Sequence, residues 1–161
     1  MVKGSKGFTI IEVLIALAIL SVGLLALVSM MIQVVKANAF SDKMTEAAAL
    51  VQDKMEELRR LQYTDDQLTN RGDNNDVSTN VQGTPALFTS PDHSDAEPDG
   101  DPTPSVTLSP TLQRVWNVAD DTLADGTTNA NAKMKTVTVI VGWQGSKAYY
   151  VAAKTFIHAY Q

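Results

Sequence analysis

Residues 7–36 read GFTIIEVLIALAILSVGLLALVSMMIQVVK, and this stretch decides how the rest of the chain can fold. From Val13 to Ile32 there are 20 residues without a charged side chain. As a helix they rise about 30 Å, which matches the hydrocarbon thickness of a bilayer. We therefore predict that residues 8–35 form a helix that can span a membrane.

Glu12 is the only ionisable side chain between Lys6 and Lys36. An ionised carboxylate in hydrocarbon is costly, so Glu12 needs either a proton or a cationic partner. At the start of a helix its side chain can instead extend toward the lipid headgroups, where the carboxylate interacts favourably with the positive end of the helix dipole. The residues alone leave both interpretations open.

A short basic segment, MVKGSKG at 1–7, precedes the helix and places Lys3 and Lys6 on its N-terminal side. Positively charged flanks of a membrane helix stay in the cytoplasm, so the N-terminus is expected inside the cell. The part of the chain that follows the helix is then expected on the other side of the membrane.

The helical pattern continues beyond the apolar stretch, over residues 36–63. Apolar side chains that recur at spacings of three and four form one stripe on a helix. The members of this stripe are Phe40, Met44, Ala47, Val51, Met55, Leu58 and Leu61. We expect one helix from Phe8 to about Leu61, whose amphipathic second half needs a domain packed on its stripe.

Residues 64–110 are rich in Asp, Asn, Thr, Ser and Pro and show no sustained hydrophobic period. They hold nine carboxylates and one Lys or Arg side chain, Arg71. This composition predicts a long, acidic, variable loop. A short strand is predicted within it, around the sequence PALF at 85–88.

Residues 111–161 carry the strand signals. Segments rich in β-branched and aromatic residues lie at 112–118, 135–143 and 147–159, with a hairpin turn, QGS, at 144–146. Side chains that alternate onto one face of the second segment are Val137, Val139, Val141 and Trp143. The predicted fold class is α+β: a long N-terminal helix packed against a small, half-buried antiparallel sheet.

The composition argues against several classes of protein. Because the chain has no cysteine, it has no disulfide and no thiolate metal site. No broad basic, aromatic-rich face is evident, so no direct nucleic-acid partner is predicted. His93 and His158 stand alone without a catalytic motif, so neither an enzyme nor a cofactor is predicted. Trp143, Tyr149 and Tyr150 are interpreted as core and surface strand residues rather than as a stacking platform.

A metal hypothesis comes from the sequence DAEPDGD in the acidic loop. Its carboxylates alternate along the chain at Asp95, Glu97, Asp99 and Asp101. Such spacing can gather oxygen ligands around calcium, although the full EF-hand pattern is absent. The competing interpretation, a solvated loop that repels itself, is favoured.

A short basic leader that ends in glycine, followed by GFTIIEVLIALAIL, resembles the class III signal sequence of type IV pilins and of the pseudopilins of type II secretion. The resemblance implies cleavage by a prepilin peptidase between Gly7 and Phe8 and methylation of the new N-terminus at Phe8. It also implies that Glu12 pairs with the α-ammonium group on Phe8 of a neighbouring subunit during assembly. Such a buried ion pair acts better as a registration device than as a source of stability.

The resemblance also implies a structural subunit with a defined route. The protein would enter the bacterial inner membrane with its N-terminus in the cytoplasm and its C-terminal domain in the periplasm. Membrane lipid, an inner-membrane assembly platform and other pilin or pseudopilin subunits would be its partners. The final location would be an extracellular pilus or a periplasmic pseudopilus, with roles in pilus biogenesis, adhesion, motility or secretion.

Three short sequences, LSVGLLAL (20–27), RVWNV (114–118) and VTVIVGW (137–143), most resemble the PilV-type minor pilins. The chain departs from the family in two respects. Ser29 stands where many major pilins have a helix-loosening proline, which leaves Gly23 as the weak point of the helix. The disulfide that closes a C-terminal loop in many pilins is also impossible here.

Other interpretations use the same apolar stretch. A type II secretion pseudopilin shares the whole N-terminal pattern. A secretory signal peptide is suggested by ANA at 37–39, an A-x-A pattern whose cleavage would expose Phe40. A permanent single-pass anchor that carries a periplasmic binding module needs no cleavage at all.

Overall fold

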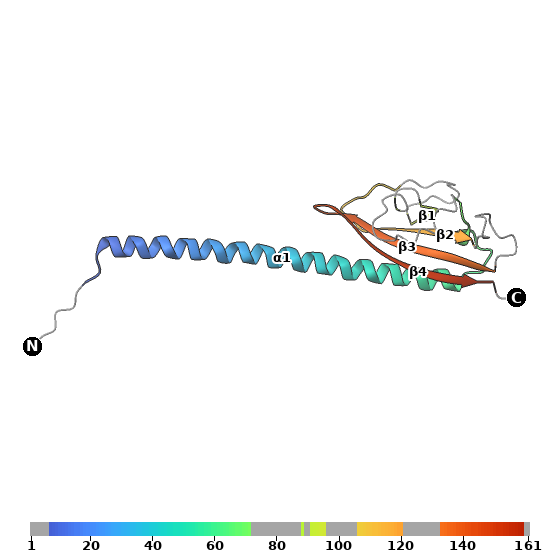
Figure 1. The fold of residues 1–161 in the computed structure, drawn as a ribbon, viewed down its shortest axis with the longest axis horizontal. Coiled ribbons are helices and arrows are strands. Elements are labelled where there is room, and N and C mark those ends of the chain that lie inside the picture. Colours follow the sequence, from blue (N-terminus) through green and yellow to red (C-terminus); the bar gives the residue numbers. More distant parts are fainter. Residues whose placement is uncertain (1–6, 72–87, 89–90, 96–105, 121–132, 160–161) are drawn as a thin grey trace, which may run out of the picture. The chain divides into compact units, whose positions relative to one another are not determined.

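The structure is a computed structural model, and it describes residues 7–71, 88, 91–95, 106–120 and 133–159. Its elements are α1 (Ile10–Arg60), a 3-10 turn η1 (Asp66–Leu68), β1 (His93–Ser94), β2 (Gln113–Asp120), β3 (Met134–Gln144) and β4 (Ala148–His158). One long helix and an antiparallel four-stranded sheet make an α+β fold, as predicted (Figure 1). The chain divides into two compact units, Met1–Asp42 and Lys43–Gln161.

The first unit contains the N-terminal part of α1. The helix begins after Thr9, whose side-chain oxygen accepts a hydrogen bond from the Glu12 amide at 3.3 Å. The Thr9 carbonyl also accepts from the amides of Glu12 and Val13, at 3.1 and 3.3 Å. Threonine is a favoured residue at this position because its hydroxyl satisfies an amide that has no partner within the helix.

The apolar stretch of α1 is long enough to cross a membrane, and none of it is buried within the chain. Its polar side chains are satisfied locally: Ser21 Oγ donates to the Ala18 carbonyl at 2.8 Å, and Ser29 Oγ donates to the Leu25 carbonyl at 3.0 Å. These bonds leave little unpaired polarity on the helix surface. The helix continues through Gly23 without a break.

In the second unit, α1 is amphipathic as predicted. Its buried residues are Ala47, Val51, Lys54 and Leu58. Met55 and Leu61 are half-buried, whereas Met44 remains exposed within the chain. The predicted stripe is therefore confirmed from Ala47 onward, but it also contains Lys54, which the apolar pattern did not include.

The sheet has the strand order β1-β2-β3-β4, and its long strands coincide with the predicted ones to within two residues. Trp116 of β2 lies opposite Val139 of β3, which lies opposite Ala153 of β4. The register runs without a slip along both pairs, so one set of alternating side chains faces α1 across all three strands.

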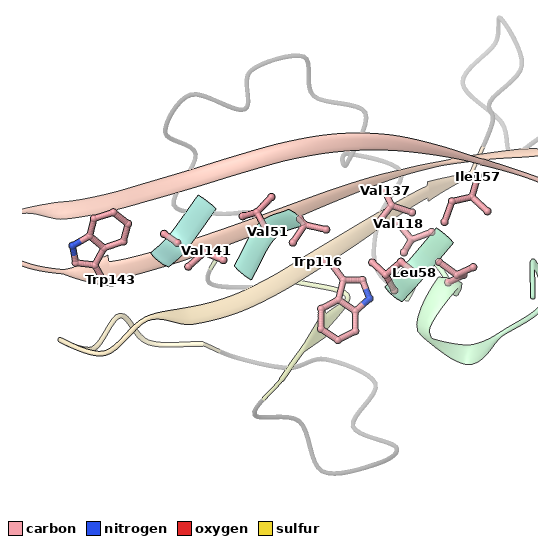
Figure 2. Packing of buried hydrophobic residues seen from close by; sticks show 11 residues of the cluster. Val51, Leu58, Trp116, Val118, Val137, Val141, Trp143 and Ile157 are labelled. Atoms are coloured by element: carbon pink, nitrogen blue, oxygen red, sulfur yellow. The ribbon is translucent and has the colours of Figure 1, made fainter. Parts of the chain in front are cut away.

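The face toward α1 forms the main core (Figure 2). The predicted alternation is confirmed, since these side chains of β3 are all buried in that core: Val137, Val139, Val141 and Trp143. Trp116 and Val118 extend the core across β2, and Leu58 of α1 packs against them. The helix and the sheet thus each cover the apolar surface of the other.

The expectation of a half-buried sheet holds only in part, because part of the opposite face is also covered, although Phe156 on that face is 60% exposed. A second core there contains Phe88, Val106, Val115 and Ile140. Phe88 lies so close to β3 that a Cβ added at Gly142 would meet its Cε2 atom at 2.7 Å. Phe88 is also helical rather than extended, so the predicted strand fails at this residue, and residues 85–87 lie outside the described part of the chain.

Candidate functional site

The candidate cleavage site lies immediately before α1. Gly7 and Phe8 are exposed, and Phe8 retains 83% of its accessible surface. A Cβ built at Gly7 would meet no atom within 4 Å among the described residues. An exposed, uncrowded segment without regular secondary structure suits a peptidase substrate, and the preceding residues 1–6 lie outside the described part of the chain.

Glu12 occupies the first turn of α1, three residues after Thr9. Its amide is satisfied by Thr9, whereas its carboxylate has no hydrogen bond or ion pair with any residue that the structure describes. Neighbouring side chains around the helix are apolar and exposed: Ile10, Ile11, Val13, Leu14 and Ile15. A carboxylate in this setting suits an amino group supplied by another molecule, since such a pair neutralises both charges in low dielectric.

Of the four candidate calcium ligands, the structure describes only Asp95. Asp95 follows β1, and its carboxylate accepts from Arg114 Nε at 2.7 Å and from Arg114 Nη2 at 3.3 Å. Glu97, Asp99 and Asp101 lie outside the described residues. Within residues 7–71, 88, 91–95, 106–120 and 133–159, no three His, Asp or Glu side chains gather to hold a metal ion.

Arg114 joins the sheet to α1. Besides Asp95, its Nη1 donates to the Leu50 carbonyl at 3.2 Å and to Asp53 Oδ2 at 3.3 Å. Burial acts to lower the pKa of Arg114, but the hydrogen bonds and charges of Asp95 and Asp53 outweigh it, so the pKa is raised. Arg114 is therefore a permanent cation that ties β2 to both the helix and the loop.

A second polar cluster connects Lys54 to His93 through Trp116. Lys54 Nζ lies 4.0 Å from the centre of the Trp116 ring and donates to Glu57 at 2.8 Å and to Gln67 at 3.1 Å. The His93 ring stacks on the same indole with centroids 5.3 Å apart. Lys54 is 4% exposed and is stabilised in the core by this cation–π contact and by its two acceptors.

His93 is thus a core residue, and it lies on β1 rather than in an irregular part of the predicted loop. Its Nε2 atom donates to the Thr69 carbonyl at 2.8 Å. His158 ends β4 and is exposed, far along the sequence from this cluster. The two histidines therefore share no site in the structure, because they lie on opposite edge strands of the sheet.

The aromatic residues of the β3–β4 hairpin are packed within the sheet. Trp143 is 1% exposed and stacks on Tyr149 with centroids 5.4 Å apart. Tyr150 points to the other face, where its ring packs edge-on against the ring of Phe88 with centroids 5.4 Å apart. These contacts agree with the interpretation of core and surface strand residues.

Sequence reasoning missed the buried lysine. The signal that could have found it is the spacing of 47, 51, 54 and 58, which places Lys54 on the stripe between Val51 and Leu58. A charged residue at a core position indicates a specific set of partners.

Residues 2–28 match the family model described as the prokaryotic N-terminal methylation motif. Searches of curated proteins and of solved structures return no match for this chain. The motif covers the basic leader, Gly7, Phe8, Glu12 and most of the apolar stretch. It indicates a protein of the type IV pilin or pseudopilin kind, made with a class III signal.

Proposed function

We propose that this chain is a structural subunit, a minor pilin, that is cut between Gly7 and Phe8 and assembled into a type IV pilus. One observation carries the proposal: the N-terminal methylation motif over residues 2–28 coincides with the apolar first part of α1, where no side chain from Ile10 to Asp42 is buried in the chain. Such a helix needs lipid before assembly and other helices afterwards.

In this proposal, residues 1–7 are a leader that prepilin peptidase removes on the cytoplasmic side of the inner membrane. Phe8 becomes the methylated first residue. The helix over 8–35 holds the subunit in the membrane until the assembly platform moves it into a filament. The chain itself performs no catalysis, and it supplies a cleavable leader, a helix for the filament core and a folded head, the unit Lys43–Gln161.

Glu12 is proposed to set the register between subunits. The α-ammonium group of Phe8 in a neighbouring subunit is the partner that the Glu12 carboxylate lacks within the described chain. A subunit docked out of register would leave both groups unpaired in an apolar core, at a cost of several kcal/mol. The pair therefore selects one axial position rather than adding much net stability.

The first experiment is N-terminal sequencing and intact-mass measurement of the protein isolated from membranes. Reading FTIIE, with the mass of one added methyl group, would support processing at Gly7. Reading FSDKM would instead indicate cleavage by signal peptidase and a released domain. An intact Met1 would favour a permanent anchor with a periplasmic binding module.

The role of Glu12 is tested separately by Glu12→Ala. Processing should remain intact, while the amount of mutant protein in sheared filaments should fall at least tenfold. Glu56→Ala is the matched control, because Glu56 is also an exposed carboxylate on α1. Normal incorporation of Glu12→Ala would rule out the registration role even if processing is correct.

The choice between a pilus and a secretion pseudopilus is tested in a deletion strain. Loss of surface fibres or twitching motility with normal secretion would support the minor-pilin assignment. Loss of secretion with normal fibres would replace it with a pseudopilin of a type II system.

A further inference from the structure

The outer edge of β4 carries a row of main-chain groups that face away from the sheet. The amide of Ala159 donates to the Lys133 carbonyl at 2.8 Å, so odd-numbered residues of β4 bond to β3. Amides and carbonyls point alternately to the two sides of a strand. Even-numbered residues, including Tyr150, Ala152 and Phe156, therefore direct these groups outward.

On the opposite side of the sheet, by contrast, outward main-chain groups of β2 have hydrogen-bond partners. β1 pairs with the middle of β2, and the amide of Asp95 donates to the Arg114 carbonyl at 3.2 Å. Further along β2, the buried Asp92 carboxylate accepts from the Val118 amide at 2.7 Å. Loop residues thus satisfy the outward groups of β2 at both ends of β1.

Among the described residues, β4 carries one of the usual features that protect an edge strand, a lysine, and lacks proline, a bulge and a short length. Its register with β3 continues from Ala148 to His158 without a bulge, and its sequence contains no proline and one Lys or Arg side chain, Lys154. In the part of the chain that the structure describes, the sheet ends at β4. A long, regular edge of this kind is a template for another strand.

A groove of about 650 Å³ lies at the C-terminal end of the same strand. The end of α1 and the residues just after it contribute Arg59, Leu61 and Tyr63, and β4 contributes Phe156 and His158. The described lining combines apolar surface with a guanidinium and an imidazole and contains no carboxylate. Its chemistry suits an apolar side chain that has an acidic group beside it.

We propose that β4 and this groove bind an extended segment of another protein by strand addition. The segment runs antiparallel to β4, bonds to the outward main-chain groups of Tyr150, Ala152 and Phe156, and places an acidic residue near Arg59. Main-chain bonds supply affinity in this mode of recognition, and the groove supplies specificity. The surface belongs wholly to the unit Lys43–Gln161, so it does not depend on cleavage at Gly7.

The test uses the full chain in detergent micelles and a synthetic ten-residue peptide that alternates valine with threonine. A glutamate near the N-terminus of the peptide meets the groove, because antiparallel pairing brings that end to the C-terminal end of β4. Amide hydrogen exchange at Tyr150, Ala152 and Phe156 should be fast in the free protein and at least tenfold slower with the peptide. A peptide N-methylated at alternate amides on the pairing side should give no protection.

Ala152→Pro removes one outward amide while leaving the bonds to β3 in place, since proline is tolerated on an edge strand. We expect at least tenfold weaker peptide binding with the thermal midpoint nearly unchanged, and Ala152→Val, which keeps the amide, should bind normally. Arg59→Gln should weaken binding of the glutamate peptide, and Arg60→Gln, which alters the adjacent arginine outside the groove, should not.

Three results would overturn the proposal. Equal binding by Ala152→Pro and the unchanged protein would mean that the peptide binds elsewhere. Slow exchange at the three amides without peptide, at every protein concentration, would mean that the chain covers its own edge. Protection that grows with protein concentration would assign the edge to a second copy of this chain.

Discussion

The two parts of α1 that belong to the two units share one backbone conformation but differ in what surrounds them. From Ile10 to Asp42 every side chain is exposed within the chain, although most are apolar. From Lys43 to Arg60 one stripe is buried against the sheet, although this part is rich in charged residues. Hydrophobicity alone therefore does not indicate which part of the helix packs within the protein.

The difference teaches that the two parts are stabilised by different partners. Most helical stability in proteins comes from packing of an apolar face. The second part finds that packing in its own sheet, whereas the first part has no such packing among the described residues, and its proposed partners are lipid and other subunits. Equivalent substitutions in the two parts should consequently have unequal effects on the head.

The largest difference is expected between Leu58→Ala and Leu24→Ala. Leu58 is 0% exposed, so its truncation should lower the free energy of unfolding by about 3 kcal/mol. Leu24 is 53% exposed within the chain, so its truncation should change that energy by less than about 0.5 kcal/mol. Denaturant unfolding of the full chain in micelles, followed by the fluorescence of Trp116 and Trp143, measures both. An equal loss in the two variants would mean that the first part of α1 supports the sheet.

The next difference concerns two glycines. Gly142→Ala brings a methyl group against Phe88 and should lower the stability of the head by about 2 kcal/mol. Gly23→Ala meets no atom within 4 Å and removes a residue of low helix propensity, so it should stabilise the helix by about 0.5–1 kcal/mol. Thermal unfolding followed by tryptophan fluorescence and by far-UV circular dichroism separates the head from the helix.

Phe88→Leu provides the control for Gly142→Ala. If the clash with the Phe88 ring is the cause, the double variant should lose less stability than the sum of the two single variants. Strict additivity would show that Phe88 and Gly142 do not interact, and the second core would need another explanation.

The parts of the fold that were predictable are those fixed by local sequence. The strands β2, β3 and β4 were predictable from segments rich in β-branched and aromatic residues. The side chains from Val137 to Trp143 alternate in the way that a strand with one buried face requires. The N-terminal methylation motif was equally predictable, because Gly7, Phe8 and Glu12 form a pattern that is continuous in sequence. Such features need no knowledge of what lies across the fold.

The features that were missed depend on distant partners. β1 is only two residues long and owes its strand conformation to pairing with β2, so His93 carries no local signal of it. Lys54 is tolerated in the core because Trp116 and Gln67 reach it from other segments. The cover on the outer face of the sheet comes likewise from Phe88, inside a segment whose composition predicted a solvated loop.

A smaller difference is expected between two arginines. Arg114→Lys should lower the free energy of unfolding by about 1 kcal/mol, because an ammonium cannot hold Asp95, Asp53 and the Leu50 carbonyl together. Arg60→Lys should have no measurable effect, since its ion pair with Glu56 is long at 3.6 Å and exposed. Chemical unfolding of the two variants in parallel gives the comparison.

The pH dependence sharpens the test of Arg114. Because its pKa is raised in the folded state, its contribution is fully present below the ordinary arginine pKa and is lost only as pH rises through the raised value. The loss caused by Arg114→Lys should therefore be the same at about pH 7 and pH 9. A loss that vanished over this range would point to a group other than the guanidinium.

The smallest effect on the head is expected at the start of α1. Thr9→Val removes the hydroxyl that accepts from the Glu12 amide and should destabilise the first helical turn by about 1 kcal/mol, with the head unchanged. Faster amide exchange at Glu12 and Val13 would report the loss, and Thr9→Ser should restore slow exchange. Unchanged exchange in Thr9→Val would mean that the helix start is held by its surroundings. Thr9 binds the amide of Glu12 and not its carboxylate. A frayed first turn together with normal filament incorporation in Thr9→Val would therefore show that the helix cap is not needed for the proposed registration role of Glu12.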